Sequence, residues 1–206
     1  MNGIQIVSTG RQLPEQIVTN EDISKMVDTS DEWIRTRSGI STRHISKGER
    51  NIDLASQAAK KAMQKGNIKP EEIGVVLVAT VTPDYITPAV ATMVQKELGL
   101  TEETMSFDIS AGCSGFLYGI KICKGLLENS TKPYALLIGS EQLSRMVDFT
   151  DRQTCVLFGD GAGAAILKLS NEHTYYQRVW SDGNDEALVC LGPGNWPAKL
   201  KMDGQA

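Results

Sequence analysis

The segment from Phe107 to Phe116, with the sequence FDISAGCSGF, contains the residue with the clearest chemical potential, Cys113. An apolar strand pattern ends there, small residues follow, and a helical pattern begins at Gly115, so Cys113 is expected in a turn beside a helix N-terminus. Backbone amides and the helix dipole favour a thiolate there. A thiolate can accept an acyl group from a thioester, with amides forming an oxyanion hole. A small buried cysteine beneath the helix is the alternative, and the residue pattern leaves both open.

A second cluster of interest, FGDGAGAA, contains Gly159, Gly161 and Ala164 at the spacing of the dinucleotide fingerprint G-x-G-x-x-G/A. That fingerprint requires a helix after the glycines, because the helix N-terminus binds the pyrophosphate. The residues that follow, AILKL, instead have a strand pattern. We therefore reject a dinucleotide site and expect close packing at a turn between two strands.

A third stretch, residues 33–50, is basic and begins with a tryptophan. It contains five basic residues and one acidic residue, which gives a local charge of +4. An indole next to arginines could hold a flat anionic ligand, by stacking on the base and pairing with phosphates. A solvated loop whose Trp33 packs on the core is the alternative, and charge alone favours it.

The elements that must position these residues alternate between apolar runs of strand length and segments of helical period. Strands are predicted at residues 3–9, 73–80, 105–109, 134–139, 156–158 and 164–169, and helices at 20–27, 54–64, 88–98 and 115–128. Asn20 and Asp53 are the expected N-caps of the first two helices. Residues 180–206 are rich in Gly, Asn and Pro and are expected to form loops. The alternation predicts an α/β layer fold with a largely parallel sheet.

Composition narrows the class of protein. The 206 residues are 41% apolar and carry a net charge of −4, which disfavours both a disordered chain and a nucleic-acid binder. No apolar run is long enough for a membrane-spanning helix, and the N-terminus has no signal-peptide pattern. The four cysteines form no Cys-x-x-Cys pair, so neither a zinc site nor a disulfide framework is expected. We expect a cytoplasmic protein with reduced thiols, three of the four being buried.

Taken together, three motifs resemble one family, β-ketoacyl-[acyl-carrier-protein] synthase III. They are residues 29–40 (TSDEWIRTRSGI), the Cys113 turn, and residues 159–164 (GDGAGA). The resemblance implies a thiolase-like fold of αβαβα layers, of which this chain supplies mainly the first α/β half, and a homodimer when full length. It implies the initiating condensing enzyme of type II fatty acid synthesis. An acyl-CoA acylates the cysteine, and malonyl-[acyl-carrier-protein] then loses CO₂ and attacks the acyl group to give 3-oxoacyl-[acyl-carrier-protein].

The resemblance also implies roles for individual residues. Cys113 is the nucleophile. Trp33 and Arg152 flank the adenine of CoA, Arg37 meets its phosphates and Thr29 lies beside it. No metal or redox cofactor is implied, because CoA is a substrate. Thr87 occupies a position where many members have a phenylalanine that limits the size of the acyl primer, so its smaller side chain predicts primers longer than acetyl.

The chain also departs from the family pattern. Members are about half as long again and carry a catalytic histidine and asparagine in their second half, whereas His44 and His173 here match neither role. We therefore expect residues 1–170 to form the N-terminal half and residues 171–206 to connect to an absent C-terminal half, in a truncated chain inactive for condensation alone. Two alternatives stay open: a non-catalytic or half-catalytic subunit whose partner chain supplies the missing pair, and a related CoA-dependent acyltransferase, against which Asp31-Glu32-Trp33-Ile34 argues.

Overall fold

The computed structural model describes residues 3–183, 188–190 and 200–202. The chain folds into two compact units. Unit 1 comprises residues 1–13, 49–141 and 161–179, and unit 2 comprises residues 14–48, 142–160 and 180–206. Within the described residues, no helix has both the length and the apolar character needed to cross a membrane.

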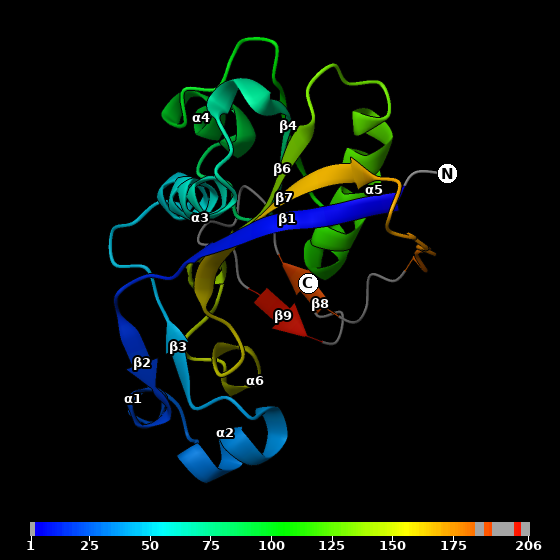
Figure 1. Cartoon of the computed structure of the whole chain (residues 1–206). Coiled ribbons are helices and arrows are strands. Elements are labelled where there is room, and N and C mark those ends of the chain that lie inside the picture. Colours follow the sequence, from blue (N-terminus) through cyan, green and yellow to red (C-terminus); the bar gives the residue numbers. More distant parts are fainter. Residues whose placement is uncertain (1–2, 184–187, 191–199, 203–206) are drawn as a thin grey trace. The chain divides into compact units, whose positions relative to one another are not determined.

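Unit 1 is built on a five-stranded sheet (Figure 1). Its order is β1 (Gly3–Gln12), β7 (Asp160–Ser170), β6 (Tyr134–Gln142), β4 (Ile73–Ala79) and β5 (Met105–Ile109). β4 pairs in parallel with both β5 and β6, whereas β1 and β7 are antiparallel. The expected parallel pairing is confirmed for β4, β5 and β6, and the β1–β7 pair is the antiparallel part of the sheet.

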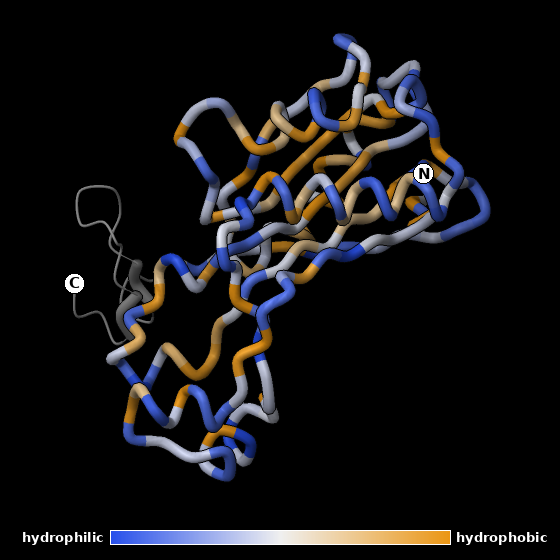
Figure 2. The backbone as a smooth tube through the Cα atoms, turned by 90° about the vertical axis from the view of Figure 1, so that its left-hand side faces the viewer, coloured by the Kyte–Doolittle hydropathy of each residue, from blue (hydrophilic) through white to orange (hydrophobic). Residues whose placement is uncertain are grey.

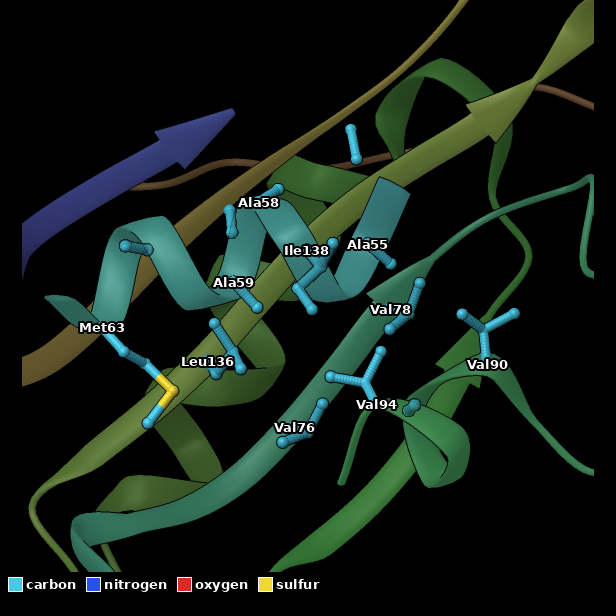
Figure 3. Close-up of a cluster of buried hydrophobic side chains, with 14 of the residues drawn as sticks. Ala55, Ala58, Ala59, Met63, Val76, Val78, Val90, Val94, Leu136 and Ile138 are labelled. Carbon is cyan, nitrogen blue, oxygen red and sulfur yellow. The ribbon is translucent and has the colours of Figure 1, made fainter. Parts of the chain in front are cut away.

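Helices cover both faces of this sheet, because side chains along each central strand alternate between two buried layers. Val76, Val78, Leu136 and Ile138 pack against α3 (Asn51–Gly66) and α4 (Val90–Glu97), as Figure 3 shows. On the opposite face, Val75, Leu77, Ala135 and Leu137 pack against α5 (Gly115–Leu127). Figure 2 shows the resulting apolar strands within unit 1. The double coverage confirms the interpretation of the apolar run at 73–80.

The starts of three helices differ from the sequence prediction. The N-cap of α1 (Asn20–Ser24) is Thr19 rather than Asn20, and its hydroxyl accepts from the Asp22 N–H at 3.2 Å. α3 begins at Asn51, and Asp53 is its third residue rather than its N-cap. α4 begins at Val90 rather than Pro88. These starts are decided by acceptors that compete for the free N–H groups at a helix N-terminus.

Two of these acceptors come from elsewhere in unit 1. Asp84 accepts from the N–H groups of Asn51 and Ile52 at 3.0 and 2.8 Å, which fixes the start of α3. Asp108, in β5, does the same for Val90 and Ala91 at 2.7 and 2.8 Å. A local sequence pattern cannot predict a cap that is supplied by a residue from a distant segment.

Unit 2 contains short elements around a small core. They are β2 (Ile17–Thr19), α1, α2 (Asp31–Ser38), β3 (Thr42–His44), α6 (Arg152–Cys155), β8 (Leu188–Cys190) and β9 (Leu200–Met202). The buried centre is formed by Ile23, Ile34, Cys155 and Val156. β2 pairs with β3 and β8 pairs with β9, both antiparallel. The β8–β9 pair corrects the expectation that the tail forms only loops.

The glycine cluster also needs a correction. Residues 156–158 are not a strand, because Val156 ends α6 as its C-cap. The cluster does not join two strands; instead it begins β7, which continues through Ser170. The strand predicted after the glycines is confirmed, and with it the structural reason for rejecting a dinucleotide fingerprint.

Replacing Gly10 by alanine is expected to destabilise unit 1 by about 2 kcal/mol. The added Cβ would clash with the backbone of α3 and push β1 away from that helix. A Cβ on Gly10 would lie 2.2 Å from the Ala58 carbonyl oxygen and 2.5 Å from the Ala62 nitrogen of α3. Gly125→Ala in α5 is the control, because a Cβ there meets nothing within 4 Å. It should stabilise the chain by about 0.5–1 kcal/mol. Urea denaturation tests both, and equal stabilities would contradict the packing argument.

Candidate active site

Cys113 lies in unit 1, where the chain passes from a strand to a helix. β5 ends at Ile109, a short 3-10 turn spans Gly112–Ser114, and α5 begins at Gly115. Gly112 has a φ of 50°, a left-handed conformation that glycine adopts without strain. The Cys113 side chain is exposed, so the buried-cysteine alternative is wrong. A nucleophile at the carboxyl end of a strand and beside a helix N-terminus has the geometry that anion binding uses.

Close packing holds this turn in place. A Cβ on Gly115 would lie 3.0 Å from the Ala79 Cβ at the end of β4, and a Cβ on Gly139 of β6 would lie 3.6 Å from the Phe116 ring. The first turn of α5 is therefore pressed against two neighbouring strands. Because a larger residue at position 115 would displace the turn, the orientation of the Cys113 thiol depends on this contact.

The other cysteines have a different character. Cys123 is fully buried in α5, and burial raises the pKa of its thiol to about 12. Cys155 is also fully buried, and burial raises its thiol pKa as well. The side chain of Cys190 lies outside the described residues. Since the thiolate is the reactive form, Cys113 is the best-placed nucleophile among the three described cysteines.

A polar cluster lies at the carboxyl ends of β4 and β6, on the same edge of the sheet as the Cys113 turn. The Glu141 carboxylate accepts from the Val81 N–H at 2.8 Å and from the hydroxyls of Thr80 and Thr82. Asn51, which is fully buried, donates to the Thr80 hydroxyl at 3.1 Å. These residues form no motif in the sequence, and the one available signal was a carboxylate directly after the apolar run YALLIGS.

The contribution of Glu141 to the free energy of unfolding should fall as the pH rises. Burial raises the pKa of its carboxyl above the ordinary value of 4.5, although its hydrogen bonds oppose the shift. Between 4.5 and this higher folded-state pKa, the folded chain binds more protons than the unfolded chain, so its contribution to stability is lost as pH rises. Glu141→Gln removes this titration. Urea denaturation from about pH 4.5 to about pH 7.5 should therefore show the variant gaining stability relative to wild type, and a constant difference would contradict the assignment.

In unit 2, Trp33 lies close to two guanidinium groups. The Arg37 Cζ is 4.3 Å from the centroid of the indole ring and the Arg152 Cζ is 4.8 Å from it, both at cation–π distance. Arg152 also donates to the Asp28 carbonyl at 3.0 Å. Trp33 is half-buried and both arginines are exposed, so a ligand from solvent can reach this stack.

Thr29 and Thr87 were the remaining predicted site residues. The Thr29 hydroxyl oxygen is buried, and among the described residues it has no hydrogen-bond partner. It precedes Ser30, the N-cap of the helix that carries Trp33. Thr87 is exposed in the loop between β4 and α4, next to Ile86, which is 89% exposed. This loop belongs to unit 1, and Trp33 and Thr29 belong to unit 2.

A hollow of about 650 Å³ lies on unit 1, between β1, β7 and the start of α5. Phe116 and Gly139, which pack beside the Cys113 turn, are among its lining residues, together with Ile6 and Arg11. Neither Cys113 nor Thr87 lines it.

Both histidines bond through Nδ1 to an oxygen of unit 1 or unit 2 of the chain. His44 Nδ1 bonds with the Pro14 carbonyl at 2.6 Å, and His173 Nδ1 bonds with the Ser170 hydroxyl at 2.9 Å. Each ring is thus held by an oxygen of a nearby segment.

The matching family model and the curated relatives point to one family. The family model described as 3-oxoacyl-[acyl-carrier-protein (ACP)] synthase III matches residues 107–183. A β-ketoacyl-[acyl-carrier-protein] synthase III of Clostridium botulinum is 52% identical over 100% of this chain and 67% of its own length. The enzyme of the same name from Clostridium tetani is 50% identical over 82% of this chain and 50% of its own length.

Solved structures agree in fold. The 3-oxoacyl-[acyl-carrier-protein] synthase III of Aquifex aeolicus has a TM-score of 0.81 at 39% identity, over 98% of this chain and 65% of its own. That of Pseudomonas aeruginosa has a TM-score of 0.89 at 33% identity, over 98% of this chain and 64% of its own. The matches thus span 50% to 67% of the length of these relatives, and the chain shares their thiolase-like α/β fold. It belongs to the β-ketoacyl-[acyl-carrier-protein] synthase III family.

Proposed function

We propose that Cys113 accepts an acyl group from acyl-CoA as the first step of a β-ketoacyl-[acyl-carrier-protein] synthase III reaction. The observation that carries this proposal is the exposed thiol in a turn between a strand and the N-terminus of α5. The thiolate sulfur attacks the thioester carbonyl, the bond between that carbonyl and the CoA sulfur breaks, and CoA leaves as a thiol after taking up a proton. Backbone amides of the turn can donate to the oxyanion, and the N–H groups of Ser114 and Gly115 would have to exchange their present bonds to the Ala111 and Gly112 carbonyls to do so.

The Trp33 stack is the proposed site for the adenine of CoA. An indole ring and a guanidinium can hold a purine between them, and Arg37 supplies positive charge for phosphates. The Arg152 guanidinium lies 4.8 Å from the ring centroid, too close for a base to enter between them. Binding therefore requires Arg152 to move off the ring. Thr29, whose buried hydroxyl precedes the same helix, is the fourth residue of the proposed CoA site.

The second step would be condensation. Malonyl-[acyl-carrier-protein] loses CO₂, the resulting carbanion attacks the acyl-cysteine carbonyl, and the Cys113 thiolate leaves as 3-oxoacyl-[acyl-carrier-protein] forms. The enolate intermediate needs hydrogen-bond donors, which the family resemblance assigns to a histidine and an asparagine in its second half. We assign acyl acceptance to the residues described here, and condensation to the full-length family enzyme, as a homodimer in the cytoplasm.

The test of this assignment is the intact mass of the chain after incubation with acetyl-CoA, followed by peptide mapping. One added acetyl group on the peptide that contains Cys113 supports the proposal. A chain that stays unlabelled, or that carries the acetyl group on another cysteine, overturns it. Adding malonyl-[acyl-carrier-protein] to the acetylated chain then asks whether these residues also condense, because condensation would remove the label.

The small side chain at Thr87 predicts a primer longer than acetyl. In the complete enzyme, four- to eight-carbon acyl-CoAs should have a kcat/KM at least equal to that of acetyl-CoA, because a threonine leaves volume that a phenylalanine would fill. Thr87→Phe should shift the preference toward acetyl-CoA. Competition between the acyl-CoAs measures both effects, and a strong preference of the wild-type enzyme for acetyl-CoA would refute this role.

A further inference from the structure

Unit 2 contains a buried arginine whose guanidinium donates to neutral oxygens. Arg43 is 5% exposed, and burial lowers the pKa of its guanidinium. Its Nη2 donates to the Asn20 side-chain oxygen at 2.9 Å and to the Val156 carbonyl at 3.0 Å, and its Nη1 donates to the Val18 carbonyl at 3.4 Å. Burying a cation without hydrogen-bond acceptors would destabilise the fold, so these three oxygens are held within hydrogen-bond distance of the guanidinium.

Asn20 connects Arg43 to a second element, helix α2. It is fully buried, and its Nδ2 donates to Asp31 Oδ1 and to the Ile40 carbonyl, each at 2.8 Å. The amide oxygen therefore faces the cation and the amide nitrogen faces the carboxylate. Only this orientation satisfies both neighbours, so the side chain works as a fixed link between Arg43 and Asp31.

The two ends of this network are the two elements that form the Trp33 stack. Asp31 is the first residue of α2, which carries Trp33 and Arg37. Val156 is the C-cap of α6, whose first residue is Arg152. One buried guanidinium thus connects to α2 through Asn20 and to α6 directly, and those helices carry the groups that meet at the indole ring.

We infer that Arg43 and Asn20 are positioning residues that set the spacing of the Trp33–Arg152 stack and thereby tune the recognition of nucleotide-bearing thioesters. The inference rests on the proposed CoA site. It goes beyond a role in stability, because a general loss of folding would affect every acyl donor equally. A positioning role affects only donors that carry the adenine nucleotide.

The test is Asn20→Asp, which keeps the size of the side chain. One carboxylate oxygen still accepts from Arg43, but the other replaces the N–H group that faced Asp31 and the Ile40 carbonyl. The link to α2 is broken while the link to α6 remains. Asp31→Ala removes the other partner of the same hydrogen bond, which is partly exposed. This variant is used if Asn20→Asp fails to fold. Asn51→Asp, the same change at an equally buried asparagine in unit 1, is the control for the effect of a buried carboxylate, and because Asn51 belongs to the polar cluster near the Cys113 turn, only the ratio of the two donors is compared for it.

Two readouts apply to the full chain. The first is the rate of Cys113 acylation by acetyl-CoA and by acetyl-N-acetylcysteamine, a thioester without a nucleotide. Asn20→Asp should raise the KM for acetyl-CoA up to about tenfold, the factor expected if the free energy of one charged hydrogen bond is passed on in full to the CoA site, and leave the short thioester within about twofold. Asn51→Asp should leave the ratio of the two donors unchanged. The second readout is the ¹⁵N-labelled indole resonance of Trp33, assigned with Trp33→Phe, which should shift only in Asn20→Asp and Asp31→Ala.

The outcomes separate this inference from the proposed function. If Asn20→Asp slows both thioesters equally, or changes neither, while wild type uses acetyl-CoA, the inference is wrong and the proposed function stands. If wild type shows no preference for acetyl-CoA over the short thioester, the CoA site is wrong. In that case the Trp33 resonance still decides whether the network positions the stack: a shifted resonance supports it, and an unchanged one overturns it.

Discussion

Cys113→Ser is expected to lower the rate of acyl transfer from acetyl-CoA by at least about a thousandfold, with little change in stability. A serine hydroxyl at neutral pH is a much weaker nucleophile than a thiolate, and removing a nucleophile typically costs this much or more. The side chain is exposed, so its replacement removes no core contact. Rapid quenching followed by intact-mass measurement gives the rate. A variant that kept more than a tenth of the wild-type rate would mean that another group accepts the acyl chain.

Cys123→Ser is the control for this substitution. Cys123 is fully buried in α5, where a hydroxyl would lose its hydration. We expect a loss of about 1–3 kcal/mol in the free energy of unfolding, because the new polar group is buried without a built-in partner. Acylation per folded molecule should stay at the wild-type rate. The two variants thus separate loss of a nucleophile from loss of structure.

Trp33→Ala is expected to weaken CoA binding by roughly 30- to 100-fold. Stacking of a base on an aromatic ring is worth about 1–3 kcal/mol, and the adjacent guanidiniums lose their cation–π partner as well. Each 1.4 kcal/mol is a factor of about ten in affinity. Isothermal titration of the chain with CoA measures the change. Pantetheine, which lacks the nucleotide, should bind both proteins equally.

Trp180→Ala is the control for this measurement, since Trp180 is a second indole of unit 2 and is 74% exposed. Its removal should leave CoA affinity unchanged. If Trp33→Ala also left CoA affinity unchanged, the indole would be a packing residue of the unit 2 core, as the charge pattern alone suggested. Equal losses for CoA and pantetheine would instead indicate a misfolded unit 2.

Features that depend on neighbours along the chain could be predicted from the sequence. The buried strands are confirmed at 73–79 and 134–142, because continuous apolar runs of strand length can be buried only between two layers, and the short strand at 105–109 is confirmed as a partly buried strand at the edge of the sheet. The Cys113 turn is confirmed for a similar reason: a strand end, a glycine at a left-handed position and a helix start all lie within a short stretch of chain. The family follows from three such local motifs.

The hydrogen-bond partners of the buried polar side chains could be identified only in the folded structure. Asn20 was expected as a helix cap, but Thr19 takes that role and Asn20 instead links Arg43 to Asp31. Arg43 was counted only as one charge in a basic stretch, yet it bonds to Val156, 113 residues away. A polar residue that folding buries must find partners from whichever segments surround it, and those segments are set by packing. Apolar periodicity therefore predicted the layers, while the partners of buried polar groups depended on contacts between distant segments.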